Sequence, residues 1–197
     1  TLSTFPLVAH KASAEAIKGA RVYLGILVST SIVFFLPAII WIFSVVGTLD
    51  FTHGGIIRND FTPLSTMYLL ILFAFGIGKA AIFPIHPWLP SAMVAPTPVS
   101  ALLHAVAVVK AGVFSVLKIG IYIFGIEHLS NTSSSLWLVW LAAFTILFAS
   151  MVAISKDNLK SRLAYSTVSQ LSYIILGLAL ATTAGILGAA LHIVMHA

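Results

Sequence analysis

The chain has 197 residues, of which 60% are hydrophobic and only 8% are charged, and its mean hydropathy is +1.10. A typical soluble domain carries about 25% charged residues, so the composition excludes a soluble domain, a disordered chain, a coiled coil and a nucleic-acid-binding protein. It indicates an integral membrane protein, whose outer surface can be apolar because its solvent is lipid. The chain has no cysteine, which excludes disulfides, thiol chemistry and cysteine-ligated iron–sulfur clusters.

The two ends of the chain indicate a piece of a longer protein. The first residue is Thr1, and no basic segment followed by a short apolar run indicates a signal peptide. The last residues, from Leu191 to Ala197, stop inside an apolar helical pattern without a capping residue. We therefore expect residues 1–197 to form a single transmembrane region that is a fragment of a larger domain.

Apolar stretches of helical length follow one another along the chain. Residues 13–16 are typical of a helix start, and the stretch from Val22 to Val46 is long enough to cross about 30 Å of hydrocarbon, with a kink predicted at Pro37. The further predicted spans cover residues 64–83, 99–125, 136–154 and 164–182, and a last one begins near 184 and is cut off. The sequence therefore predicts an all-α, polytopic transmembrane helical bundle with about five full spans plus a truncated sixth.

Prolines interrupt the predicted bundle after the second span. Within fifteen positions the sequence holds Pro84, Pro87, Pro90, Pro96 and Pro98, so no regular helix is expected to continue there. This pattern predicts a proline-broken helix near residues 79–98. Unwound backbone at membrane depth is tolerated where it lines a cavity, and broken helices beside an intramembrane charge mark transport sites. An ordinary turn at the membrane interface is the alternative.

Basic residues predict the orientation of the chain. Residues 1–21, 84–98 and 155–162 are predicted on one side of the membrane and together hold six Lys or Arg, whereas the loops on the other side hold only Arg58. The positive-inside rule places the six-charge side in the cytoplasm. We therefore interpret the positive formal net charge, +5, as a signal of how the chain is oriented in the membrane.

Two lysines lie well inside apolar runs. Charged Lys79 and Lys110 would each cost from about 2.5 to over 10 kcal/mol at the middle of a bilayer, so they are expected to face the protein interior or water. Lysine shifts its pKa readily on burial, which a proton relay requires. Lys110 lies about 16 Å from either predicted helix end, too far to reach the headgroups easily, whereas Lys118 is close enough to do so.

Histidines add to this polar set. His104 precedes Lys110 by six residues and falls on another face of the same predicted helix, so a water or a third group would have to connect them. His192 and His196 are four residues apart and share a helix face, which predicts a polar track. That spacing also suits zinc, but no third ligand accompanies the pair, so we expect no metal site.

The segments 78–93, 95–105, 109–113, 157–170 and 192–197 closely resemble one family, in fixed order. It comprises the antiporter-like membrane subunits of respiratory complex I, of Mrp-type multisubunit cation/proton antiporters and of membrane-bound hydrogenases. The resemblance implies that Lys79 is the lysine of the broken seventh span, Lys110 the lysine of the eighth and His104 the histidine before it. It also implies that His192 and His196 are the polar histidines of the eleventh span.

Two features of the family are absent from this sequence. The glutamate that pairs with the seventh-span lysine lies outside it, and the role does not transfer to Glu15, which precedes the first span. Ser91 stands where the family usually has Asp, which suggests a divergent branch nearer to the Mrp or hydrogenase subunits. The fragment is thus expected to cover the sixth to eleventh spans.

The resulting hypothesis is translocation of protons, or of Na⁺ and H⁺, along a buried axis through Lys79, His104, Lys110, His192 and His196, beside the helix broken at Pro84, Pro87 and Pro90. No cofactor is expected in this chain, and any redox catalysis of an NADH–quinone oxidoreductase would belong to other membrane subunits. The expected location is a bacterial or archaeal cell membrane. A self-contained secondary transporter with a substrate at the broken helix, or a membrane scaffold without transport, are the alternatives.

Overall fold

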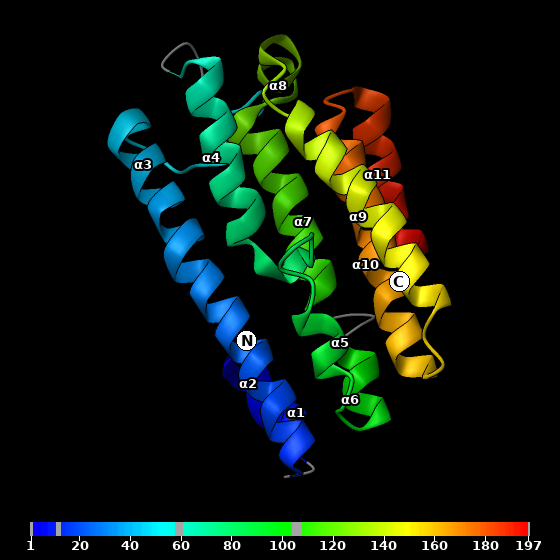
Figure 1. The fold of residues 1–197 in the computed structure, drawn as a ribbon. Helices are drawn as coiled ribbons and strands as arrows, with labels where there is room; N and C mark the ends of the chain where they lie inside the picture. The colour runs from blue at the N-terminus through cyan, green and yellow to red at the C-terminus, as the bar shows by residue number, and fades with distance from the viewer. Residues whose placement is uncertain (1, 11–12, 58–60, 104–107, 197) are drawn as a thin grey trace.

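The computed structural model describes residues 2–10, 13–57, 61–103 and 108–196, and the regular structure within these residues is entirely helical (Figure 1). This confirms the all-α prediction. The α-helices are α1 (Phe5–Val8), α2 (Ala14–Thr30), α3 (Leu36–Val46), α4 (Pro63–Gly76), α5 (Trp88–Ala92), α6 (Thr97–Ala101), α7 (Val109–Ile119), α8 (Ile126–Thr132), α9 (Leu136–Ile154), α10 (Leu159–Ala179) and α11 (Thr183–Met195).

The first long helix runs from Ala14 to Val46 and is α2 and α3 joined by a π-helical turn, Ser31–Phe35. The helix starts where predicted, because the Ser13 side chain accepts a hydrogen bond from the Ala16 N–H at 3.1 Å. The wider turn immediately precedes Pro37, which has no N–H to donate and would clash with a regular preceding turn. A π-helical turn is one of the usual ways in which a helix accommodates such a disturbance.

The second span is shorter than predicted. Its helix α4 ends at Gly76 instead of near Phe83, and the chain continues through a 3₁₀ turn, Gly78–Ala80. No regular helix continues through the five prolines, as expected, although the short helices α5 and α6 form among them. Pro90 and Pro98 lie in the first turns of these helices, where a missing N–H breaks no hydrogen bond.

The segment after α7 also differs from the prediction. Helix α7 continues into a second π-helical turn, Gly120–Phe124, and residues 126–132 form helix α8, bent by 80° from α7, where a loop was expected. The Ile123 carbonyl accepts hydrogen bonds from the N–H groups of Ile56 and Ile57 at 2.9 and 3.0 Å. These bonds tie the connection between α3 and α4 to the end of α7.

The C-terminal half is an antiparallel set of three helices. Helix α9 covers the predicted span, 136–154, and packs along α10, which in turn contacts α11. Helix α10 begins at Leu159, earlier than predicted, because the Asn158 side chain caps it by accepting from the Lys160 N–H at 2.9 Å. Helices α10 and α11 both contact α7, so this half packs against the first half through α7.

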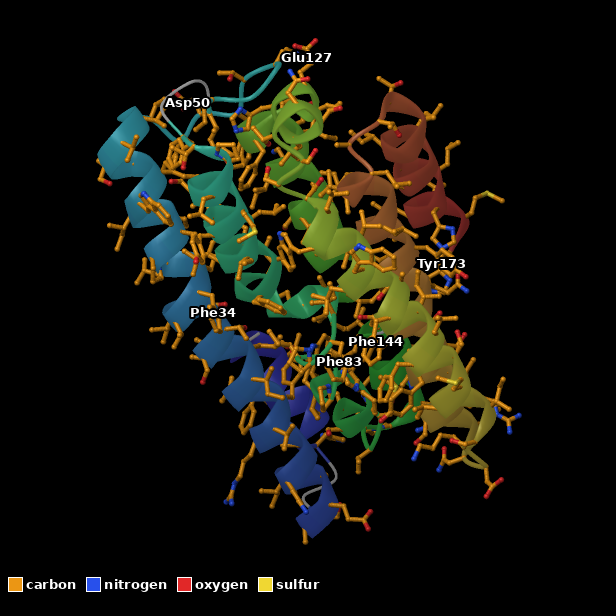
Figure 2. The ribbon with its side chains drawn as sticks, turned by 45° about the horizontal axis from the view of Figure 1, so that its top comes forward. Phe34, Asp50, Phe83, Glu127, Phe144 and Tyr173 are labelled. Atoms are coloured by element: carbon orange, nitrogen blue, oxygen red, sulfur yellow. The ribbon has the colours of Figure 1, made fainter. Side chains whose placement is uncertain are left out.

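Within the described residues, two helices are long and apolar enough to cross a membrane, 14–46 and 136–154, and a third is counted if α7 and the bent α8 form one span. The number of five spans plus a sixth stays a prediction. The start of α2, the α5–α6 turn and the α9–α10 turn lie at one end of the bundle, hereafter the basic end (Figure 1). Asp50 and Glu127 lie at the opposite end (Figure 2).

Candidate functional site

Lys79 lies on the break between α4 and α5. The N–H of Ile77 makes the last hydrogen bond of α4, to the Phe73 carbonyl, and Lys79 is the middle residue of the 3₁₀ turn that follows. The buried Trp88 indole fixes this turn, because its Nε1–H donates to the Gly78 carbonyl at 2.9 Å. The backbone at the break therefore has a defined conformation held from α5.

Close backbone contacts bring three helices to this break. A Cβ atom placed on Gly112 of α7 would lie 2.5 Å from the carbonyl carbon of Lys79, and one placed on Gly76 would lie 2.6 Å from the Phe35 nitrogen. No side chain larger than hydrogen fits at either position without moving backbone. Gly112 therefore allows α7 to lie directly on the backbone that carries Lys79, two residues from Lys110.

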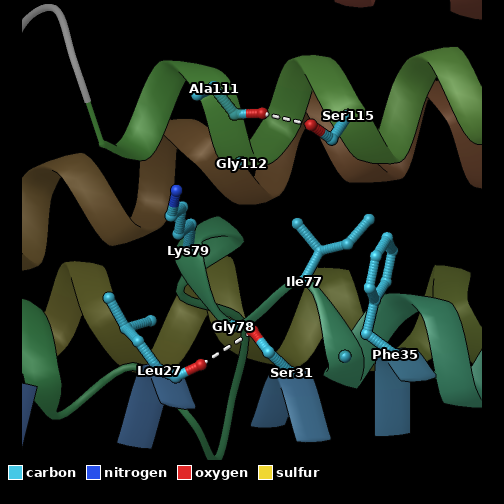
Figure 3. Close-up of a pocket in the computed structure, with 10 residues that line it drawn as sticks. Leu27, Ser31, Phe35, Ile77, Gly78, Lys79, Ala111, Gly112 and Ser115 are labelled. Carbon is cyan, nitrogen blue, oxygen red and sulfur yellow. Dashed lines mark hydrogen bonds between the residues drawn. The ribbon is translucent and has the colours of Figure 1, made fainter. Parts of the chain in front are cut away.

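A cavity of about 160 Å³ lies beside Lys79, between α2, the break and α7 (Figure 3). Ser31 and Ser115 line it together with Lys79. The two hydroxyls donate within their own helices, Ser31 to the Leu27 carbonyl at 2.8 Å and Ser115 to the Ala111 carbonyl at 2.7 Å. Their oxygens stay available as acceptors, and the volume has room for several water molecules.

The Lys79 side chain is half-buried and extends from the break on the side that faces α7 (Figure 3). Within the described residues it has no hydrogen-bond or ion-pair partner. An ammonium group in such a place needs water or a partner outside these residues, since an unpaired charge inside an apolar bundle is costly. The cavity supplies the space for that water.

Lys110 is the most buried charged side chain among the described residues, with 9% of its surface exposed. It occupies the first turn of α7, and its Nζ donates a hydrogen bond to the Ile193 carbonyl of α11 at 3.1 Å. Its partner is therefore a neutral backbone oxygen. Lys110 therefore faces the protein interior, one of the two surroundings expected for it, and its role in an axis stays a prediction.

The two histidines of α11 share one face, as predicted. Their rings are stacked, with centroids 6.1 Å apart and planes 13° apart, and the ring of His192 lies 6.0 Å from that of Tyr173 on α10. The Nε2 atom of His192 is buried and has no hydrogen-bond partner among the described residues. Because Ile193 adjoins His192, the hydrogen bond from Lys110 brings α7 to this pair.

The other predicted residues fall into three groups. His104 lies outside the described residues. Pro84 and Pro87 belong to the turn between Lys79 and α5, and Pro90 is the third residue of α5. Lys118 extends over the ring of Phe51 at 4.2 Å, a cation–π contact toward the end of the bundle opposite the basic end, so it stands apart from the axis.

On the side toward the basic end, the residues that follow the break pack against α9 and α10 through aromatic rings. These contacts were not predicted from the sequence. The ring centroids of Phe83 and Phe144 lie 5.1 Å apart (Figure 2). The ring of the buried His86 is stacked on Phe83, and it meets the Phe148 ring edge-on with centroids 5.5 Å apart. Lys160 of α10 donates to the Ala95 carbonyl at 3.0 Å, between α5 and α6. The broken segment is therefore fixed to the C-terminal half as well as to α7.

Sequence reasoning also missed the small residues of the site. Ser115 is a single serine in an apolar helix and Ser31 follows Ser29 and Thr30 in another, and such hydroxyl groups are common without function. Gly112 does follow Lys110 by two positions, and a glycine inside a helix that carries a buried charge was the available signal of close packing.

Comparison with known proteins identifies the family. The whole chain, residues 1–197, matches the family model described as NADH:quinone oxidoreductase/Mrp antiporter, TM. A probable K⁺/H⁺ antiporter protein of Rhizobium meliloti (strain 1021) is 38% identical over 94% of this chain and 18% of its own length. Subunit 5 of the chloroplastic NAD(P)H-quinone oxidoreductase of Phaseolus vulgaris is 34% identical over 82% of this chain and 22% of its own length.

The fold agrees with a solved structure as well. The Mrp complex from Dietzia sp. DQ12-45-1b contains a chain that superposes with a TM-score of 0.84 and 31% identity, over 99% of this chain and 21% of that one. The present chain thus spans about a fifth of the length of the proteins that it matches. The chain is a multi-pass integral membrane protein and belongs to the NADH:quinone oxidoreductase/Mrp antiporter transmembrane family.

Proposed function

We propose that the chain translocates protons, or exchanges Na⁺ and H⁺, along an axis that runs from Lys79 through Lys110 to His192 and His196. The observation that carries the proposal is the burial of Lys110 against a neutral carbonyl of α11, beside the histidine pair. The family to which the chain belongs includes antiporter and quinone oxidoreductase subunits, which supports ion transport as its role.

The chemistry of the four side chains suits a proton relay. Lysine and histidine each exist in a charged and a neutral form, and neither lysine has a carboxylate partner among the described residues that would hold it charged. A change of charge at one lysine alters the pKa of the next through low-dielectric surroundings. The backbone of Lys79 touches α7 two residues from Lys110, which makes such coupling short-ranged.

His104 is included in the proposed axis because the resemblance of residues 95–105 implies it; the residue itself lies outside the described residues. Other membrane subunits supply the redox or driving reaction, because the relatives are subunits of multisubunit assemblies. Residues 1–21 and 155–162, which hold three Lys or Arg each, face the cytoplasm in this proposal, together with residues 84–98, which hold none. The start of α2, the α5–α6 turn and the α9–α10 turn lie at the same end of the bundle (Figure 1).

The decisive experiment replaces one lysine at a time in the intact complex, reconstituted in vesicles. Lys79→Met and Lys110→Met should each lower proton uptake at least about tenfold, a conservative figure beside the roughly 10²- to 10⁴-fold that one positioned proton-transfer group contributes in enzymes. Methionine is an unbranched side chain only one heavy atom shorter than lysine, and it carries no exchangeable proton.

Lys118→Met is the matched control, because Lys118 lies on the same helix as Lys110 and its ammonium group lies over the Phe51 ring, away from the axis. It should keep most of the uptake. If the Lys79 and Lys110 variants assemble normally and pump like the Lys118 variant, the axis is wrong and a scaffold role is favoured.

A further inference from the structure

A charged pocket lies at the basic end, among residues that the proposed axis does not use. It has a volume of about 230 Å³ between α2 and α5, and it is lined by Glu15, Lys18, Gly19, Val22, Ser91 and Val94. The two helices are in close contact here, because a Cβ atom on Gly19 would overlap the Ser91 carbonyl oxygen. The pocket therefore has two walls that are held against each other.

The two charges of this pocket have no partner in the protein. Glu15 and Lys18 lie three residues apart on α2, so they are neighbours on its surface. Both are exposed, and neither forms an ion pair or a hydrogen bond within the part of the chain that the structure describes. The Ser91 hydroxyl donates to the Pro87 carbonyl at 2.8 Å, and its oxygen can still accept. The pocket thus offers a cation, an anion and a hydroxyl to a ligand.

These groups lie at the depth of the lipid headgroups. The apolar run of the first long helix begins at Val22, and Lys18 precedes it by four residues, about 6 Å along the helix. The headgroup layer on each side of the hydrocarbon core is roughly 5–7 Å thick. Lys18 is therefore level with the lipid phosphates, and Glu15 lies nearly one turn closer to the water.

A second groove, of about 390 Å³, lies deeper in the membrane on the same side of α2. Residues 84–87 form one wall, and α2 with its π-helical turn forms the other. The side chains that line it are apolar except for Ser29 and Thr30, and the Thr30 hydroxyl donates to the Leu27 carbonyl at 3.2 Å. Such a lining suits an acyl chain, which neither gives nor needs hydrogen bonds.

The pocket and the groove lie along one face of the first long helix. Lys18 and Val22 line the pocket. Ile26, Ser29 and Val33 line the groove, and successive members of this series are three or four residues apart, which keeps them on one side of a helix. Ile26 and Val33 lie about 6 and 16 Å beyond Val22, within the hydrocarbon layer. A molecule with a charged head and a long apolar tail matches this order of linings.

We propose that one molecule of phosphatidylethanolamine occupies this face, with its headgroup in the charged pocket and an acyl chain in the groove. Its ammonium group pairs with the Glu15 carboxylate and its phosphate with the Lys18 ammonium, so each charge of the pocket meets its opposite. The N–H groups of the lipid ammonium can donate to Glu15 and to the Ser91 oxygen. Phosphatidylglycerol fits less well, because its phosphate satisfies Lys18 and leaves Glu15 without a cation.

The test uses the intact complex in vesicles that contain equal amounts of phosphatidylethanolamine and phosphatidylglycerol. In separate samples a small share of one of the two lipids carries a photoreactive diazirine at the middle of an acyl chain, and the labelled residues are located by mass spectrometry. Label on residues 26–34 and 84–87 should be roughly two- to fivefold more frequent from phosphatidylethanolamine, the range that one exposed ion pair supports. Equal label from both lipids would overturn the proposal. Absence of label from these residues would also overturn it, because a protein segment would then cover the groove.

Charge reversal at Glu15 sharpens the test. Glu15→Lys places two cations beside the lipid phosphate, so the preference should change to phosphatidylglycerol. Glu127→Lys is the matched control, since Glu127 is an exposed carboxylate in the first turn of α8, at the opposite end of the bundle (Figure 2), and it should keep the original preference. If Glu15→Lys also keeps that preference, the headgroup site is wrong. The label does not depend on Lys79 or Lys110, so this result is independent of the proposed axis.

Discussion

The contact between Gly112 and Lys79 gives the sharpest structural prediction. The change is Gly112→Ala, which adds one methyl group to α7. Its carbon would lie 2.5 Å from the Lys79 carbonyl carbon and 2.6 Å from the Ala80 nitrogen. Both atoms belong to the backbone, so rotation of a side chain does not relieve the overlap.

The size of the effect follows from these distances. Non-bonded carbon atoms rest at about 3.5–4.0 Å, so α7 and the break would have to separate by about 1 Å. Overpacking of this kind costs about 1–3 kcal/mol, against which alanine gains up to about 1 kcal/mol over glycine inside a helix. The separation also moves the backbone of Lys79 away from α7, so transport should fall more than stability does.

Gly25→Ala is the matched control, because a Cβ atom at Gly25 of α2 meets nothing within 4 Å. The assay compares the heat-denaturation midpoints of the two purified variants in detergent, together with their proton uptake in vesicles. Gly112→Ala should denature at a lower temperature than Gly25→Ala and pump less. If the two variants match in both measurements, the close contact between α7 and the break is wrong.

Two further predictions concern other contacts. Trp88→Phe removes the buried hydrogen bond to the Gly78 carbonyl and should cost about 1–3 kcal/mol, seen as a lower denaturation midpoint; an unchanged midpoint would contradict the role of Trp88 in holding the break. At the end of the bundle opposite the basic end, burial lowers the pKa of His128, which shares a hydrogen bond of 2.9 Å with Thr66. The unfolded chain therefore binds more protons there, so this contribution to stability is complete above about pH 6.5 and is lost as the pH falls toward the lower folded-state pKa. His128→Gln should show a smaller decrease in denaturation midpoint between about pH 7.5 and about pH 5.5, and an equal decrease would argue against this assignment.

The sequence alone was sufficient for features that depend on local chemistry. The span 136–154 agrees with α9 because it is a charge-free apolar run, and the helix start at Ser13 agrees because a serine hydroxyl caps the N–H groups that follow it. The break near Lys79 was predictable from the prolines that follow it, and the shared face of His192 and His196 from their spacing.

Tertiary structure decided which partners these residues have. The helix after residue 63 ends at Gly76, before the first proline, because Trp88 binds the Gly78 carbonyl and α7 packs on the Lys79 backbone. The Ile193 carbonyl that receives Lys110 lies 83 positions away in the sequence, and no local pattern encodes such a pair. Hydropathy and spacing report on neighbours along the chain, whereas the surroundings of a buried charge depend on which helices pack against it.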